Sequence, residues 1–212
     1  MPTSRRVVLA ARPDGIPQAE HFRIETYEPP ALKPGEIFVR NQFLSVEPAM
    51  RGWVSAVANY AQPVGIGEVM RSIASGEVVA SEHPGFAPGD KVTGMFGWQE
   101  LAAVPASAVT RKVTETDLPL STSLGVMGIN GLTAYFGLLD VGLPKPGDTV
   151  VVSTASGSVG SAVGQIAKIM GCRTVGIAGG PDKVAQCLQD FGYDAAIDYK
   201  AVNDLSGALA AA

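Results

Sequence analysis

A glycine-rich segment in the second half of the chain has the residue types and spacing best suited to chemistry. Ala155-Ser156-Gly157-Ser158-Val159-Gly160 has the G-x-G-x-x-G spacing, with Ala in the first glycine position. It follows a continuous β-branched run, 149–153, and precedes a segment with helical periodicity. In that context Gly157 lets the backbone approach a pyrophosphate, and free N–H groups at the helix start attract its charge. The segment therefore predicts a dinucleotide site, the alternative being a tight strand–helix turn without ligand.

The end of the next predicted strand, 174–178, bears on which dinucleotide binds. An Asp or Glu there would hydrogen-bond the adenine ribose of NAD, but the strand is followed by two glycines, 179–180. Asp182 lies a few residues beyond the end of this strand and is better placed to cap a helix. Lys183 offers a cation for a 2′-phosphate, or else is a solvated residue in the first turn of that helix. The sequence thus favours NADP(H) over NAD.

Regular elements must hold this segment in place. The residues after the glycines form an apolar stripe at helical spacing, and Gly171 stands where that helix should end; the stripe is Val159, Ala162, Val163, Ile166 and Ile169. Further strands at 174–178 and around Ala196, with a helix starting near Asp204, complete one half of a doubly wound parallel sheet.

A helix over 130–141 is predicted to link this region to the first half of the chain. Asn130 is its candidate cap, and apolar residues recur on one face: Leu132, Tyr135, Phe136 and Leu139.

The first half of the chain, 1–120, has a different texture. Short β-like runs at 7–11, 21–28, 36–46, 73–81, 91–96 and 100–104 alternate with Pro-Gly and Pro-Pro turns. We therefore expect a small, mostly antiparallel β-domain over 1–120, followed by the nucleotide-binding region over 121–212.

Composition excludes several classes. The 212 residues are 46% hydrophobic and 17% charged with a net charge of −4, which is typical of a folded domain without a basic surface for nucleic acid. The longest uncharged stretch, 118–139, is too polar and glycine-rich for a membrane helix, and the N-terminus lacks a secretory apolar segment. We expect a cytoplasmic protein. Cys172 and Cys187 lack metal or redox spacing and are predicted to be reduced and structural.

Several blocks of sequence resemble one known family. The segment 41–51, ending Glu47-Pro48-Ala49-Met50-Arg51, is similar to a stretch of the zinc-independent medium-chain dehydrogenase/reductases, in the group of prostaglandin, curcumin and plant double-bond reductases. The blocks 76–80, 83–86, 89–92, 131–139, 163–168 and 198–200 also match that group, in the same order.

The resemblance implies a fold of class α/β plus β: a GroES-like β-domain followed by a Rossmann doubly wound parallel sheet. It implies NADP(H), with Gly157, Ser158, Val159 and Gly160 along the pyrophosphate. It places Lys183 and Tyr199 at the 2′-phosphate and Thr133 near the nicotinamide. No metal is expected, because zinc-dependent relatives use an early Cys and a Gly-His-Glu block, whereas this chain has no early Cys and reads Ser75-Gly76-Glu77.

The implied activity is reduction of the C=C bond of an enone or enal, with hydride added to the β-carbon. A hydrogen-bond donor must then stabilise the oxygen where charge develops. Tyr60 is the candidate catalytic residue, and a loop anchor is its alternative role. Ala49 and Leu101 replace two tyrosines of the family, which leaves the substrate range open.

Relatives in this group are about half again as long, so the second half of the Rossmann sheet is expected to lie outside this chain. Two other functions stay open: an NADPH quinone reductase of the same superfamily, and a non-catalytic cofactor-binding or interaction protein. The partners expected are a small-molecule enone or enal and a second copy in a homodimer, since the group often forms dimers.

Overall fold

The computed structural model describes residues 3–57 and 61–212. Contacts divide the chain into two compact units, Met1–Leu124 and Gly125–Ala212, called the N-terminal unit and the C-terminal unit below.

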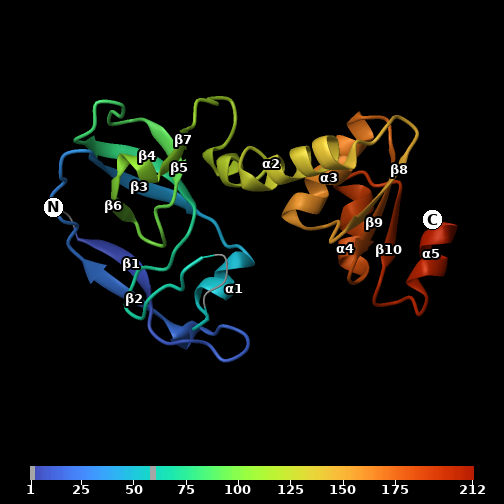
Figure 1. Ribbon diagram of the computed structural model, residues 1–212, viewed down its shortest axis with the longest axis horizontal. Coiled ribbons are helices and arrows are strands. Elements are labelled where there is room, and N and C mark those ends of the chain that lie inside the picture. Colours follow the sequence, from blue (N-terminus) through green and yellow to red (C-terminus); the bar gives the residue numbers. More distant parts are fainter. Residues whose placement is uncertain (1–2, 58–60) are drawn as a thin grey trace. The chain divides into compact units, whose positions relative to one another are not determined.

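The N-terminal unit is built on antiparallel strands (Figure 1). Its main sheet has five strands in the order β6-β3-β4-β5-β7, and β1 pairs with β2 in a separate two-stranded sheet. The strands are β1 (Ser4–Leu9), β2 (Phe22–Tyr27), β3 (Glu36–Leu44), β4 (Ala74–Ser81), β5 (Lys91–Gly94), β6 (Leu101–Pro105) and β7 (Val109–Lys112). The helices are α1 (Ala49–Trp53) and three 3₁₀ turns, η1 (Ala19–His21), η2 (Ala106–Ala108) and η3 (Leu120–Leu124).

Burial alternates along β6, as in a strand with one face on the core, whereas β3, β4 and β5 each have three consecutive buried residues. Ile37, Val39, Val78, Val92 and Phe96 form the core of the main sheet and are almost completely buried. The six strands expected in this half of the chain are confirmed, with ends shifted by a few residues. β7 and α1 were not predicted, since β7 is four residues long with alternating burial and α1 is a single turn and a half.

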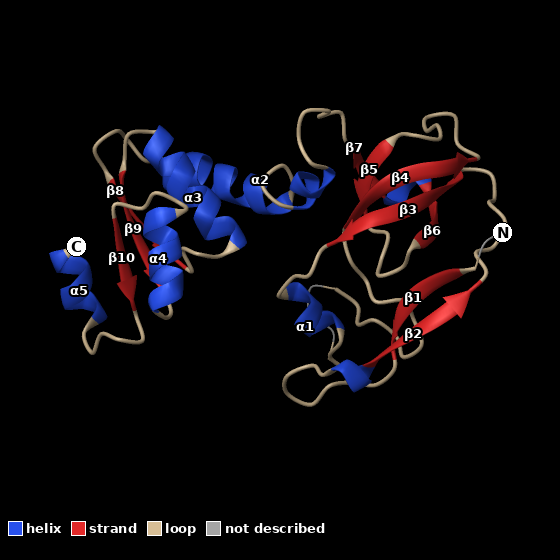
Figure 2. Cartoon of the chain, turned by 180° about the vertical axis from the view of Figure 1, so that it is seen from behind, coloured by secondary structure: helices blue, strands red, loops and turns tan. Residues whose placement is uncertain are grey.

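The C-terminal unit is a three-stranded parallel sheet with helices on both sides. The strand order is β10-β9-β8, the order of one mononucleotide-binding half. In both views α3 and α4 lie on one side of the strands and α5 on the other (Figures 1 and 2). The elements are α2 (Ile129–Phe136), the π-helical η4 (Gly137–Gly142), β8 (Thr149–Ser153), α3 (Ser158–Ile169), β9 (Arg173–Ala178), α4 (Pro181–Gln189), β10 (Ala195–Asp198) and α5 (Leu205–Ala211).

These elements confirm the strand, helix and strand succession read from the sequence, including the helix end at Gly171, which has φ +80°. Two details of the predicted helices were wrong. Gly128, not Asn130, is the N-cap of α2. Ile169 does not continue the buried stripe of α3, because it is 83% exposed in the last turn.

The predicted apolar face of α2 was also wrong. Leu132, Tyr135 and Phe136 are each about half exposed in this structure, whereas Gly131 and Ala134 are buried. A Cβ on Gly131 would press on the backbone of Val126, and α2 as a whole packs against α3. Both cysteines are free and buried, as predicted.

Tyr193 fixes the position of α3 on the sheet. Its ring is 4% exposed, and its hydroxyl donates a hydrogen bond of 2.6 Å to the carbonyl of Gly160. A Cβ on Gly164 would lie 2.5 Å from Tyr193 Cε2, so α3 approaches the ring only because position 164 has no side chain. The ring, the first turn of α3 and β9 therefore form one packed contact.

Asp194 joins the other end of α3 to the sheet. Its carboxylate accepts hydrogen bonds from Lys168 Nζ at 2.6 Å and from the backbone N–H of Thr174 at 2.7 Å. The Lys168 ammonium, more than the Thr174 N–H, lowers the pKa of Asp194 below its ordinary value of 3.8.

Replacing Gly164 with Ala tests the contact between α3 and Tyr193. The added methyl must displace a buried ring, and overpacking of this kind costs about 1–3 kcal/mol. We expect the far-UV circular dichroism transition in urea to move to lower urea. Tryptophan fluorescence should change little, because both tryptophans of the sequence, Trp53 and Trp98, lie in the N-terminal unit.

Gly137→Ala is the matched control, since a Cβ at Gly137 meets nothing within 4 Å. An unchanged urea transition in Gly164→Ala would contradict the packing described for Tyr193.

Asp194→Asn tests the ion pair through its pH dependence. A carboxylate with a lowered pKa stabilises the fold fully above 3.8, and this stabilisation is lost as the pH falls through the lowered value. Between about pH 5 and about pH 3 the urea midpoint of the wild type should therefore fall further than that of Asp194→Asn. Parallel curves would rule out a contribution from the Asp194 carboxylate.

Candidate functional site

The glycine turn between β8 and α3 presents a helix start without a side-chain cap. α3 begins at Ser158, and its N-cap Gly157 makes no side-chain capping bond. The turn is closed by a hydrogen bond of 2.8 Å from Gly157 N–H to Thr154 O. Since the first N–H groups of a helix have no partner within it, this turn offers donors and a positive helix end to an anion.

Gly160 allows the turn to lie close to the strand. A Cβ at this buried residue would press on the carbonyl of Thr154 and would lie 2.9 Å from the Cα of Ala155. Both neighbours are backbone atoms, which a side chain cannot displace cheaply. Thr154 itself has φ +53°, an unusual value for a residue with a side chain, and this local strain occurs directly beside the predicted site.

A cavity of about 280 Å³ opens beside this turn, at the carboxyl ends of the three parallel strands. Lys183 from α4 and Tyr199 and Lys200 after β10 line it. The remaining lining residues belong to the turn after β8 and to the end of β9: Ser153, Thr154, Ser156, Ile177, Ala178 and Gly179. The structure thus brings together Lys183 and Tyr199, two residues that the family resemblance placed at one phosphate.

Lys200 was missed by the sequence analysis. It is exposed, and its neighbour Tyr199 is 51% exposed. The available signal was its position: it follows directly on the third parallel strand, where ligand-binding residues of such sheets gather. The cavity therefore has two cationic side chains.

The loop after β9 is shaped by two glycines. Gly180 has φ +101° and is the N-cap of α4, so Asp182 lies in the first turn and is not the cap that the sequence suggested. A Cβ on Gly179 would lie 2.8 Å from Tyr199 Cε1 and 3.0 Å from Lys200 Cε. Position 179 is therefore open so that both side chains can lie across the loop.

Asp198 is the acid closest in sequence to these residues, and its carboxylate is already engaged. Oδ1 accepts hydrogen bonds from Gly180 N–H at 2.9 Å and from Lys200 N–H at 3.0 Å. These bonds, with a smaller contribution from the Lys200 charge, lower the pKa of Asp198. Both bonds use Oδ1 of a residue that ends β10, whereas the ribose-binding acid would be expected at the end of β9, where Gly179 and Gly180 follow the strand.

Of two other predicted site residues, the structure describes only Thr133. Thr133 is an exposed residue of α2, and its hydroxyl donates a hydrogen bond of 2.7 Å to the carbonyl of Ile129. It does not line this cavity. Tyr60 lies outside the described residues.

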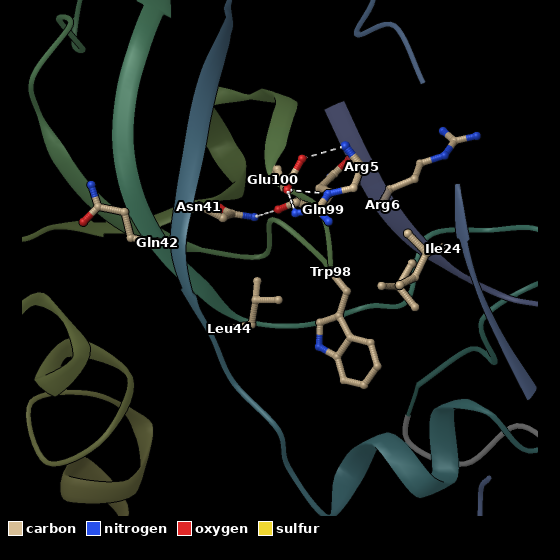
Figure 3. A pocket seen from close by; sticks show the side chains of 10 residues that line it. Arg5, Arg6, Ile24, Asn41, Gln42, Leu44, Trp98, Gln99 and Glu100 are labelled. Carbon is tan, nitrogen blue, oxygen red and sulfur yellow. Dashed lines mark hydrogen bonds and ion pairs between the residues drawn. The ribbon is translucent and has the colours of Figure 1, made fainter. Parts of the chain in front are cut away.

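The N-terminal unit has a hollow of about 320 Å³ between β1, β2, β3 and the segment before β6 (Figure 3). At its charged end two lining residues form an ion pair: Arg5 Nε donates a hydrogen bond of 2.8 Å to Glu100 Oε1. Asn41 Nδ2 donates a hydrogen bond of 2.8 Å to the carbonyl of Gln99. The other end is apolar, with Leu44 and Trp98 on its wall. The Arg5–Glu100 pair is thus satisfied within the hollow, whereas Asn41 Oδ1 is buried without a hydrogen-bond partner among the described residues.

The described ranges, 3–57 and 61–212, contain no group of three or more His, Cys, Asp or Glu side chains that could hold a metal. They also contain no helix with the length and apolar character needed to cross a bilayer.

Comparison with known families matches both units. The family described as the N-terminal domain of oxidoreductase matches residues 5–112, and the family described as zinc-binding dehydrogenase matches residues 158–212.

Individual relatives match over nearly the whole chain. It is 43% identical to an NADPH-dependent curcumin reductase of Escherichia coli (strain K12), over 99% of this chain and 60% of that protein. It is 36% identical to a 2-alkenal reductase (NADP(+)-dependent) of Nicotiana tabacum, over 98% of this chain and 62% of that protein. The crystal structure of CurA from Vibrio vulnificus in complex with NADPH superposes with a TM-score of 0.87 at 44% identity, covering 98% of this chain and 61% of that one.

The chain therefore spans about 60% of the length of the curated relatives it matches. With one matched domain over half of the sequence, the second in the expected order and these relatives along nearly its whole length, the chain belongs to the medium-chain dehydrogenase/reductase family, in the group that contains the curcumin and alkenal reductases.

Proposed function

We propose that the chain carries the β-domain and the first half of the cofactor domain of an NADPH-dependent reductase that acts on the C=C bond of α,β-unsaturated aldehydes or ketones. The observation that carries this proposal is the cavity beside the glycine turn, lined by Lys183, Tyr199 and Lys200. Reductases of curcumin and alkenals among its relatives support the reaction class.

The residues of this cavity fit NADPH better than NADH. A 2′-phosphate carries negative charge, and charge-assisted bonds from lysine are among the stronger hydrogen bonds. NADH would instead present a ribose diol that is usually held by an acid at the end of the second strand, and here that strand, β9, is followed by Gly179 and Gly180. The Gly157–Gly160 turn would hold the pyrophosphate through N–H groups of α3.

When bound, NADPH supplies a hydride, and the protein supplies binding and orientation. The glycine turn orients the dinucleotide along the strand ends, and the lysines hold its adenosine end. Thr133 is proposed to contact the nicotinamide. Tyr60 is proposed to donate a hydrogen bond to the substrate oxygen as charge develops there.

We further propose that the reaction needs no zinc. The block that replaces the Gly-His-Glu of zinc-dependent relatives lies in β4 and serves the sheet: Ser75 is completely buried, and Glu77 forms an ion pair with Lys91. Neither residue supplies an imidazole or thiolate ligand. Homodimer formation and a cytoplasmic location stay predictions from the sequence.

Lys183→Ala tests cofactor selectivity. Loss of one charged contact to the 2′-phosphate should raise the Kd for NADPH about tenfold, which is about 1.4 kcal/mol, while the Kd for NADH stays nearly constant. Both values come from quenching of protein fluorescence or from calorimetry at fixed salt, because exposed charges are screened. Lys33→Ala, an exposed lysine of the N-terminal unit, is the control for the change in net charge. Equal weakening of both cofactors would count against a 2′-phosphate contact.

Turnover tests the reaction class. NADPH consumption is followed with a trans-2-alkenal, an aryl enone and a quinone offered separately, using the 212-residue chain and, in parallel, the full reading frame that encodes it. We expect the saturated aldehyde or ketone as product from at least one of the two proteins. Hydroquinone as the sole product would identify a quinone reductase instead. NADPH binding without turnover by either protein would favour a non-catalytic cofactor-binding protein.

A further inference from the structure

The two loops that line the cavity beside the glycine turn are joined by a backbone hydrogen bond of 3.1 Å, from Tyr199 N–H to Ala178 O, and by the carboxylate of Asp198. Asp198 ends β10 and is paired in register with Ala178, which ends β9. Its Oδ1 accepts a hydrogen bond from the N–H of Gly180 in the loop after β9, at 2.9 Å. The same oxygen accepts from the N–H of Lys200 in the loop after β10, at 3.0 Å. Beyond this backbone bond, one carboxylate oxygen therefore links the two loops.

Each of these bonds fixes a residue that faces the cavity. Gly180 is the N-cap of α4, which has no side-chain capping bond, so its anchored N–H defines where the helix begins and where Lys183 projects in the first turn. The bond to Lys200 N–H fixes the backbone between Tyr199 and Lys200. Since Gly179 leaves room for both of these side chains, the three cavity-lining residues are positioned relative to one another through Asp198.

The negative charge of Asp198 cannot be what favours an anion nearby. A carboxylate repels a phosphate, and the Lys200 charge offsets this only in part. The useful property is the geometry of its oxygen, which holds two N–H groups at once. An amide oxygen in the same place offers the same acceptor without the charge.

We propose that Asp198 is a positioning residue for cofactor selectivity: by holding the β9–α4 and post-β10 loops together, it aligns Lys183, Tyr199 and Lys200 around a single 2′-phosphate. This inference rests on the proposed function, because it requires that the cavity beside the glycine turn receives the phosphate of NADPH.

The test compares Asp198→Ala and Asp198→Asn in the full 212-residue chain. Kd is measured by calorimetry for NADPH, for NADH and for 2′,5′-ADP, which carries the 2′-phosphate without the nicotinamide. Asp198→Ala should raise the Kd for NADPH and for 2′,5′-ADP about tenfold, because the two loops must then become ordered on binding. The Kd for NADH should change by less than about twofold. Asp198→Asn should restore the affinity for both phosphate ligands to the wild-type value or above it.

Asp190→Ala is the matched control, since Asp190 is an exposed aspartate at the end of α4 and its loss changes the net charge equally. Far-UV circular dichroism confirms that each variant is folded. Equal weakening of NADPH and NADH in Asp198→Ala would indicate a merely structural role and overturn the inference. Failure of Asp198→Asn to restore binding would overturn it as well.

A failure of the proposed function can be distinguished from a failure of the role of Asp198. If the wild type gives no saturable binding of 2′,5′-ADP or NADPH, the cavity is not a 2′-phosphate site, and both proposals fall. If the wild type binds NADPH and Asp198→Ala binds it equally well, only the role of Asp198 falls.

Discussion

The C-terminal unit depends on the close contact between the first turn of α3 and the ends of β8 and β9. Three positions without a side chain make this contact possible. Gly160 lies against the backbone of Thr154 and Ala155, and Gly164 and Gly176 leave room for the ring of Tyr193. The Tyr193 hydroxyl then bonds to the carbonyl of Gly160. Because a methyl group at any of these glycines would press on a buried neighbour, the position of the helix start is determined by packing and not by the loop itself.

This packing has an electrostatic consequence. A helix start held against the strand ends, with no side-chain cap, leaves backbone N–H groups as the local donors for an anion. Backbone donors in a packed turn are preorganised, so little ordering is needed when a ligand binds. The cationic side chains at the same sheet edge come from different elements, the start of α4 and the end of β10. Under the proposed function, the glycine turn would bind the pyrophosphate, and separate elements would recognise the 2′-phosphate.

The sequence predicted those features that local pattern controls. The β-branched run of β8, the glycine spacing and the helix stop at Gly171 each have one physical interpretation, and the structure has them in the expected order. It did not predict features that depend on tertiary packing. The buried residues of α2 are Gly131 and Ala134, not the large apolar residues of its other face, and at Gly131 the backbone of Val126 leaves no room for a side chain. Lys200 and the bridging role of Asp198 depend on the juxtaposition of two strand ends that are far apart in sequence.

Selectivity at this edge follows from geometry more than from charge alone. Lys183 and Lys200 are exposed, so their attraction for a distant anion is screened within about 8 Å at physiological salt. The attraction between these lysines and a phosphate in direct contact with both is screened much less. Such contact is possible only if the two side chains converge. Convergence requires that the loops after β9 and β10 keep a fixed separation, and a flexible pair of loops would lose binding energy to ordering. The hydrogen bonds within the protein that involve no lysine charge therefore decide how much of the lysine charge a ligand can use.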